Sequence, residues 1–215
     1  MEKVIATPNR PANSMTASRL SLVCSVGTLL LLASLHILSP ELDPSWRMVS
    51  DYALGDYGWV LTLMFLAWAL SCVALFFAIK SQVQTIWGKI GLGILIVSAV
   101  GMGMAAIFDV THNLHGLAAL IGIPSFPIAA MLVSLSLVRN QDWSTIRRPL
   151  LLMANLTSIS LVLMFATLFI GLSKSGGEFG PDVLIGWPNR LLVMTYCGWL
   201  IMVAWFVERF RPVLR

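Results

Sequence analysis

The chain alternates long uncharged stretches with short segments that carry the charges. Between Arg19 and Glu208, six long intervals contain no Asp, Glu, Lys or Arg. A bilayer core offers no water to backbone amides, so a stretch of roughly 20 apolar residues is stable there only as a helix that closes its own hydrogen bonds. The pattern therefore predicts an all-α, polytopic transmembrane bundle of six helices, at about residues 20–38, 57–79, 89–108, 115–138, 150–172 and 190–208.

The composition of the chain supports this fold class. Apolar residues make up 58% of the sequence and charged residues 11%, whereas about a quarter of the residues in a soluble domain are charged. The spans and their connections occupy residues 19–210, between an N-terminal tail at 1–18 and a C-terminal tail at 211–215. The first span is expected to stay as an anchor, because it is too long for a signal-peptide core and no small-x-small site follows it. We expect no separate soluble domain.

Basic residues gather on one side of the predicted bundle. The two tails and the loops after the second and fourth spans hold 11 of the 14 Lys and Arg residues, and the other three loops hold seven of the ten acidic residues. Because basic loops stay on the cytoplasmic side, both tails are predicted to be cytoplasmic. The predicted location is the cytoplasmic (inner) membrane of a bacterium, multi-pass, N-in and C-in. The basic residues on the cytoplasmic side account for the net charge of +4. We therefore expect the lipid bilayer as the partner, and no nucleic acid.

Tryptophans and glycines predict how the spans sit in the membrane and against each other. Aromatic belts form at membrane interfaces, and four tryptophans lie near span ends: Trp59, Trp87, Trp143 and Trp187. Small residues let two membrane helices approach closely, and the third span carries four glycines: Gly91, Gly93, Gly101 and Gly103. We expect the tryptophans to lie at the interfaces and the glycines to face a neighbouring helix.

All three histidines fall on the side opposite to the basic loops. His36 lies near the outer end of the first span, and His112 and His115 flank the hairpin between the third and fourth spans. On a continuous helix, the spacing Asp109-x-x-His112-x-x-His115 places its side chains on one broad face. Imidazoles and a carboxylate suit zinc or another divalent ion, and His36 could complete the ligand set. The same residues are also consistent with proton sensing or with solvated side chains at a water interface.

Arg190 opens the sixth span from the same outer side. A cation at this depth must extend to water or pair with a carboxylate. The candidate partners on this side are Asp51, Asp109 and Glu178. A guanidinium is also well suited to hold the phosphate or carboxylate of a substrate. The sequence leaves both roles open, a structural ion pair and ligand binding.

Several short motifs resemble those of a known family. They are the run Ser50-Asp51-Tyr52-Ala53-Leu54-Gly55-Asp56-Tyr57-Gly58-Trp59 before the second span and the later pairs Phe108-Asp109, His115-Gly116 and Asn189-Arg190. This series resembles the bacterial membrane proteins catalogued as domain of unknown function 998, over about residues 20–208. Asn189 departs from the Gln-Arg pair that this family often has. The resemblance implies a six-helix integral membrane protein with a polar external mouth, and it supplies no activity.

A more distant likeness is to the membrane hydrolases that include alkaline ceramidases and adiponectin receptors. Their members use Ser, Asp and three His around a zinc ion. In this comparison, the corresponding residues of this chain would be Ser50, Asp109, His36, His112 and His115. The hydrolases have a seven-helix core and an His-x-x-x-His pair on a late helix, and this sequence has neither.

The sequence thus supports two functional hypotheses. The first is a non-enzymatic protein that binds, senses or transports a small molecule, lipid headgroup or ion at a polar His/Asp site in the extracytoplasmic mouth. The second is a metal-dependent membrane hydrolase for a lipid, amide or ester, in which a divalent ion such as zinc activates water. The candidate residues are Asp109, Asp51 and Ser50 for catalysis, Arg190 and Tyr52 for substrate binding, and His36, His112 and His115 for the metal. Neither hypothesis includes an oligomeric state.

Overall fold

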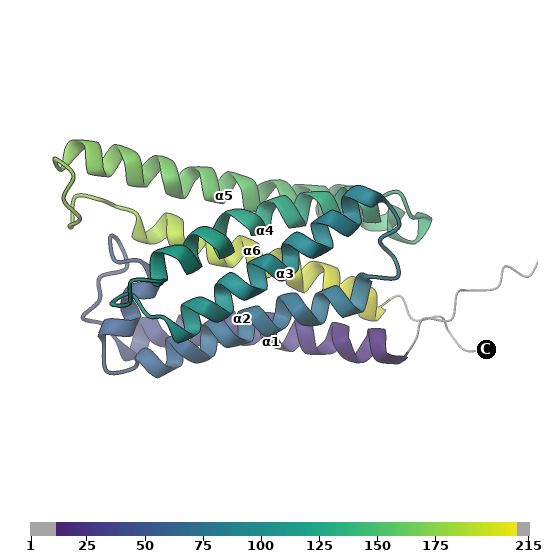
Figure 1. Cartoon of the computed structure of the whole chain (residues 1–215), viewed down its shortest axis with the longest axis horizontal. Helices are drawn as coiled ribbons and strands as arrows, with labels where there is room; N and C mark the ends of the chain where they lie inside the picture. Colours follow the sequence, from purple (N-terminus) through teal and green to yellow (C-terminus); the bar gives the residue numbers. More distant parts are fainter. Residues whose placement is uncertain (1–11, 210–215) are drawn as a thin grey trace, which may run out of the picture.

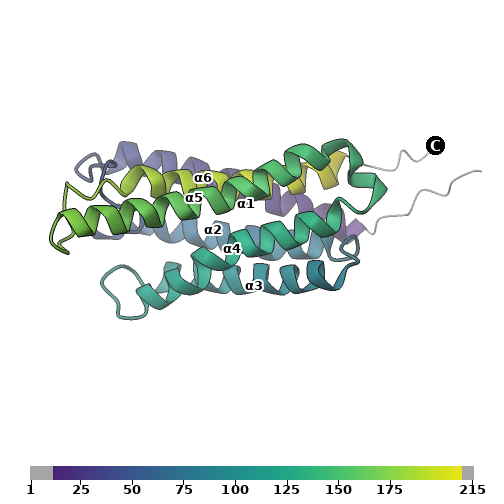
Figure 2. The ribbon, with the colours of Figure 1, turned by 90° about the horizontal axis from the view of Figure 1, so that it is seen from above.

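Six long helices run side by side in an elongated bundle (Figures 1 and 2). The computed structural model describes residues 12–209. The long helices are α1 (Ala12–Leu38), α2 (Gly58–Ile79), α3 (Ile86–Ile107), α4 (His115–Leu137), α5 (Arg147–Lys174) and α6 (Gly186–Arg209), and two short 3-10 helices, η1 (Val49–Leu54) and η2 (Gln141–Ile146), lie between them. No strand occurs among the described residues, which confirms the all-α fold class.

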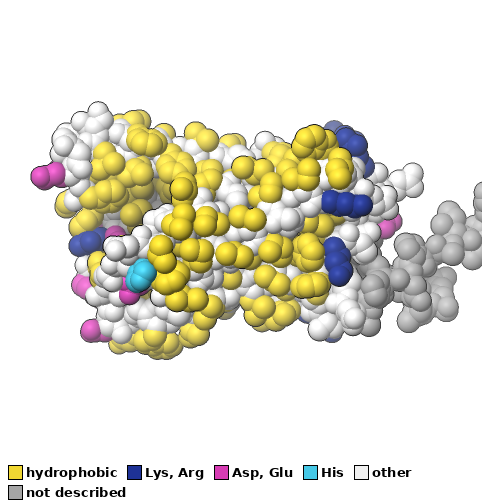
Figure 3. All heavy atoms as spheres, in the orientation of Figure 1, with side chains coloured by type: hydrophobic (Ala, Val, Ile, Leu, Met, Phe, Trp, Pro, Cys, Tyr) yellow, Lys and Arg dark blue, Asp and Glu magenta, His cyan; other side chains and the backbone are white. Residues whose placement is uncertain are grey.

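The surface of the bundle fits a membrane. Each of the six long helices in the described chain is long and apolar enough to cross a bilayer, which confirms the six predicted spans. Hydrophobic side chains cover the middle of the visible face, while most of its Lys and Arg lie toward one end and most of its acidic side chains toward the other (Figure 3). The chain is therefore a multi-pass membrane protein.

The two ends of the bundle carry different connections. At one end lie the α1–α2 loop, the α3–α4 turn and the α5–α6 loop, at residues 39–57, 108–114 and 175–185 (Figure 1). We call this the histidine end. The opposite end, the basic end, holds the other two connections and both ends of the described chain. There Arg19 Nε and Glu208 Oε1 join the first and last helices by an ion pair of 2.9 Å.

Several helices extend beyond the predicted spans, because a helix does not have to stop where its apolar run stops. α1 begins at Ala12 instead of residue 20, and α6 begins at Gly186 instead of residue 190. Residues 12–18, predicted as part of a tail, therefore belong to α1. The remainder of that tail, at 1–11, and the predicted tail at 211–215 lie outside the described residues.

Small residues set the approach of α3 to α4. A Cβ atom on Gly101 would overlap the backbone of Gly122 in α4, and one on Gly91 would lie 2.8 Å from a side-chain atom of α4. A Cβ atom on Gly93 or on Gly103 would have no other atom within 4 Å. The predicted close helix contact is thus confirmed for one pair of glycines and is wrong for the other pair, because the two pairs lie on different faces of α3.

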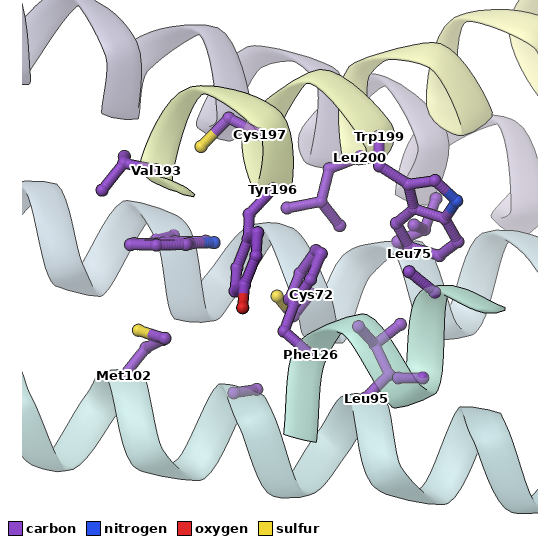
Figure 4. Packing of buried hydrophobic residues seen from close by; sticks show 14 of the residues in the cluster. Cys72, Leu75, Leu95, Met102, Phe126, Val193, Tyr196, Cys197, Trp199 and Leu200 are labelled. Carbon is purple, nitrogen blue, oxygen red and sulfur yellow. The ribbon is translucent and has the colours of Figure 1, made fainter. Parts of the chain in front are cut away.

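An aromatic cluster fills the centre of the bundle beside α6 (Figure 4). The ring of Tyr196 stacks on Phe126 of α4 with 4.3 Å between centroids, and Trp199 meets Phe126 edge-on at 5.8 Å. Pro127 has no N–H for the carbonyl of Ile123, one helical turn earlier. Tyr196 Oη donates to that carbonyl at 2.9 Å instead. These contacts place α6 in the middle of the fold.

Three of the four tryptophans that were predicted to lie at the membrane interfaces are on the surface of the bundle. Trp59, Trp87 and Trp187 are 57–63% exposed on the bundle surface. Trp143 is fully buried, and its Nε1 donates to Gln82 Oε1 at 3.0 Å. The prediction for Trp143 is wrong because η2 brings this ring under the helix ends, where it finds a hydrogen-bond acceptor inside the protein.

Candidate functional site

The α1–α2 loop closes over the start of α6 at the histidine end. The backbone N–H of Gly186 donates to Ser45 O at 3.0 Å, and that of Val49 donates to Asn189 Oδ1 at 2.8 Å. A Cβ atom on Gly186 would lie 2.8 Å from Arg47 O, so the loop can come this near only to a glycine. The loop therefore covers the face of the first turn of α6 that carries Gly186 and Asn189.

Arg190 lies beneath this loop with only 3% of its surface exposed. Its Nε donates to His36 Nε2 at 2.7 Å, and its Nη2 donates to Tyr52 Oη at 3.1 Å. Its Nη1 donates to two backbone carbonyls, Arg47 O at 2.7 Å and Gly186 O at 3.0 Å. Four of the five N–H groups of the guanidinium are therefore used. All four acceptors are neutral.

No carboxylate of the described residues balances the charge of Arg190 at close range. The sequence predicted three possible partners, Asp51, Asp109 and Glu178. None of the described acidic side chains lies within 4.0 Å of the guanidinium, so the predicted ion pair is wrong. In the exposed loop, the pKa of Asp43 is lowered mainly by hydrogen bonds from Ser45 and, to a smaller extent, by the charge of Arg190.

The two predicted catalytic carboxylates are bound to nearby backbone groups. Asp51 is buried in η1, where its Oδ2 accepts from Met48 N at 2.9 Å. Asp109 is exposed, and its Oδ1 accepts from the hydroxyl and the backbone N–H of Thr111 at 2.5 and 2.8 Å. The Thr111 hydrogen bonds, more than the neighbouring histidines, hold the pKa of Asp109 below its ordinary value. Each carboxylate thus stabilises a local turn.

His36 uses both ring nitrogens for protein contacts. Nδ1 lies 2.7 Å from Leu32 O, which can only accept, so Nδ1 carries the proton. Nε2 then accepts from Arg190, and the imidazole is neutral. The ring lies edge-on to Tyr52 at 5.7 Å and stacks with Trp187 at 6.5 Å between centroids. A metal ion needs a free lone pair on a ring nitrogen, and neither nitrogen of His36 has one.

The turn between α3 and α4 holds the other two histidines. His112 Nδ1 accepts from Leu114 N at 3.1 Å, and His115 Nδ1 donates to Phe108 O at 2.9 Å. Residues 108–114 are not a continuous helix, so the spacing of three does not align the side chains on one face. Over residues 12–209, no group of three or more His, Cys, Asp and Glu could hold a metal ion. The predicted zinc ligands His36, His112 and His115 are therefore not brought together.

Two hollows lie at the histidine end, on different sides of α6. A groove of about 590 Å³ runs between α1 and α6, where His36, Trp187 and Arg190 border apolar side chains. A cavity of about 250 Å³ lies among η1 and the helices α2 to α6, and its polar lining residues include Ser50 and His115. The arrangement can bind molecules with an apolar body and a polar group.

The predicted site residues do not form one site. Arg190, Tyr52 and His36 form one hydrogen-bonded cluster, whereas Ser50 and His115 border the other hollow. Asp51, Asp109 and His112 line neither hollow. Sequence reasoning missed Arg47 and Gly186 because they act through backbone carbonyls, which every residue type has. Trp187 precedes Arg190 by three residues, a spacing that places both on one helix face.

The motifs that resemble a known family lie along this same end of the bundle. A family model described as protein of unknown function (DUF998) matches residues 22–206. The chain belongs to this family. The match begins within α1 and ends within α6, so it includes four complete long helices, most of α1 and α6, and every residue that lines the two hollows. No curated protein and no solved structure matches the chain.

Proposed function

We propose that this DUF998 protein binds an anionic lipid, through its phosphate head group, in the groove between α1 and α6. Arg190 holds the phosphate, His36 and Tyr52 orient the guanidinium, and no chemical step takes place. The observation that supports this binding role is a guanidinium that is 3% exposed and has only neutral acceptors among the described residues.

A buried guanidinium is costly unless an anion compensates its charge. Removing such an ion from water costs several kcal/mol even after the surroundings relax. The four neutral acceptors offset part of that cost and leave the charge unbalanced. A phosphate oxygen at the fifth N–H would add a charge-assisted hydrogen bond worth about 1.5–3 kcal/mol. An ionisable residue in a membrane helix is also a functional-site hypothesis in its own right.

The groove continues from Arg190 along apolar side chains. Its walls run from His36 to Leu29 on α1 and from Arg190 to Met194 on α6. At 1.5 Å per residue, these walls cover about 6–10 Å, which suits the first part of an acyl chain below a head group. Leu191 and Met194 are exposed on the bundle surface, so a lipid can enter from the side. With the predicted N-in, C-in topology, this lipid belongs to the outer leaflet.

Native mass spectrometry of the purified protein tests the proposal. The protein is mixed with equal amounts of phosphatidylglycerol and of diacylglycerol with the same acyl chains, so that only the first lipid carries a phosphate. We expect the wild type to retain phosphatidylglycerol preferentially and Arg190→Gln to lose roughly 10- to 150-fold in that preference, because glutamine has no charge for the phosphate. Arg190→Lys keeps the charge without the planar fork and should keep part of the preference.

Arg47→Gln is the matched control. It removes the same charge from the same end of the bundle, whereas the site uses only the backbone carbonyl of residue 47. The Arg47 guanidinium stacks on Trp46 at 4.1 Å instead. Size-exclusion chromatography and circular dichroism report whether each variant is folded, since Arg190 also holds the loop. A preference that survives in folded Arg190→Gln, or that falls equally in Arg47→Gln, would contradict the proposal.

A further inference from the structure

The cavity on the other side of α6 is separate from the lipid groove. Its walls come from η1 and from every long helix except α1, and no residue lines both hollows. Most of its lining is apolar, with Phe65, Met102 and Val193 among the larger side chains. No Asp, Glu, Lys or Arg lines it, so its ligand has no charged group to pair with. The cavity therefore suits an uncharged molecule.

Three residues that line this cavity carry hydrogen-bonding atoms without partners in the described chain. The indole of Trp68 is 2% exposed, and within the described chain its Nε1 donates to no acceptor. Buried polar groups are nearly always paired, so such a donor calls for an acceptor. Ser50 makes no side-chain hydrogen bond over residues 12–209, and His115 uses Nδ1 and leaves Nε2 open. All three residues line the cavity.

We infer that this cavity is a second binding site, for a small, uncharged, mainly apolar molecule with one carbonyl oxygen. An apolar protein cavity of roughly 150 Å³ holds benzene, so about 250 Å³ suits a fused two-ring skeleton of roughly ten to twelve non-hydrogen atoms. The carbonyl accepts a hydrogen bond from Trp68 Nε1, and the apolar walls cover the rings.

A pair of probes that differ by one carbonyl tests this site. The ketone 1-tetralone and the hydrocarbon tetralin share the same fused-ring skeleton. Equilibrium dialysis of the protein in detergent micelles, against protein-free micelles, measures the binding of each. We expect wild type to bind 1-tetralone roughly three- to tenfold more tightly than tetralin, the effect of one neutral hydrogen bond. Trp68→Phe keeps a ring but no N–H, so it should lose this difference and still bind tetralin.

Two variants that fill the cavity show whether the probes bind there. Ala105→Phe adds a ring from α3 and Ala119→Phe adds one from α4, and both should lose both probes. Val100→Phe, on the exposed face of α3, is the matched control and should bind like wild type. The two variants lie on separate walls of the cavity, so that the test still works if one of them does not fold. Circular dichroism detects an unfolded variant.

Three results would overturn the inference. They are equal binding of the two probes by wild type, probe binding that persists in a folded cavity-filled variant, and no binding beyond protein-free micelles, which would mean that the cavity holds only solvent. Lipid retention and 1-tetralone binding are separate measurements on the wild-type protein. Either proposed site can therefore fail without the other.

Discussion

Replacing Gly101 by alanine tests the approach of α3 to α4. A Cβ atom at this position would overlap the backbone nitrogen and Cα of Gly122 and would lie 2.9 Å from Ala118 O. Backbone atoms cannot rotate away as the end of a flexible side chain can. The added methyl group therefore forces the two helices apart, whatever rotamers their side chains adopt.

The contacts around Gly101 set the size of the effect. Alanine is better than glycine inside a helix by about 0.5–1 kcal/mol, which favours the variant. Overpacking costs about 1–3 kcal/mol, and an overlap with backbone belongs at the upper end of that range. Separating the helices also weakens the hydrogen bond from Ser98 Oγ to Gly122 O, 2.8 Å long, at about 0.5–1.5 kcal/mol. The net expectation is a destabilisation of about 2–3 kcal/mol.

Thermal unfolding in detergent, followed by tryptophan fluorescence, measures this difference. For a chain of this size, the expected loss corresponds to a midpoint lower by about 4–12 °C. Gly103→Ala is the matched control, because it makes the same change in the same helix where nothing lies within 4 Å of the new Cβ atom. We expect the control to unfold at or slightly above the wild-type midpoint. A midpoint for Gly101→Ala that equals that of Gly103→Ala would refute the described helix contact.

Three further predictions concern a hydrogen bond, a carboxylate and the topology. Tyr196→Phe removes the part-buried hydrogen bond to the Ile123 carbonyl and should cost about 0.5–1.5 kcal/mol in the same unfolding assay. An unchanged midpoint would contradict that bond. Hydrogen bonds from Thr111 lower the pKa of Asp109 in the folded protein. The turn is therefore more stable above the pKa of the unfolded chain, and it loses this stability as the pH falls through the pKa of the folded protein. A carboxyl-carbon NMR titration of Asp109 should give a midpoint below 3.8. With the native cysteines replaced, Lys80→Cys should react with an impermeant maleimide only in opened cells, whereas reaction in intact cells would reverse the predicted orientation.

The number and approximate place of the helices could be predicted from the sequence because the bilayer acts on each segment separately. An uncharged run of sufficient length has one stable form in lipid, whichever neighbours it packs against. The same local logic places three of four tryptophans at the surface and indicates the family through short motifs. Trp143 shows where this logic ends, because its burial depends on Gln82, which lies on a different connection.

The partners of each polar side chain were decided only by the tertiary structure. A spacing of three suggested one histidine cluster, but the turn after α3 and the contact of His36 with Arg190 assign the three imidazoles to separate hydrogen bonds. Arg190 binds carbonyls of Arg47 and Gly186, groups that every residue carries and that no sequence pattern can mark. Membrane insertion is a sum over adjacent residues and can be read along the chain, whereas a hydrogen-bonded cluster depends on distances between residues far apart in sequence, which only the packed bundle sets.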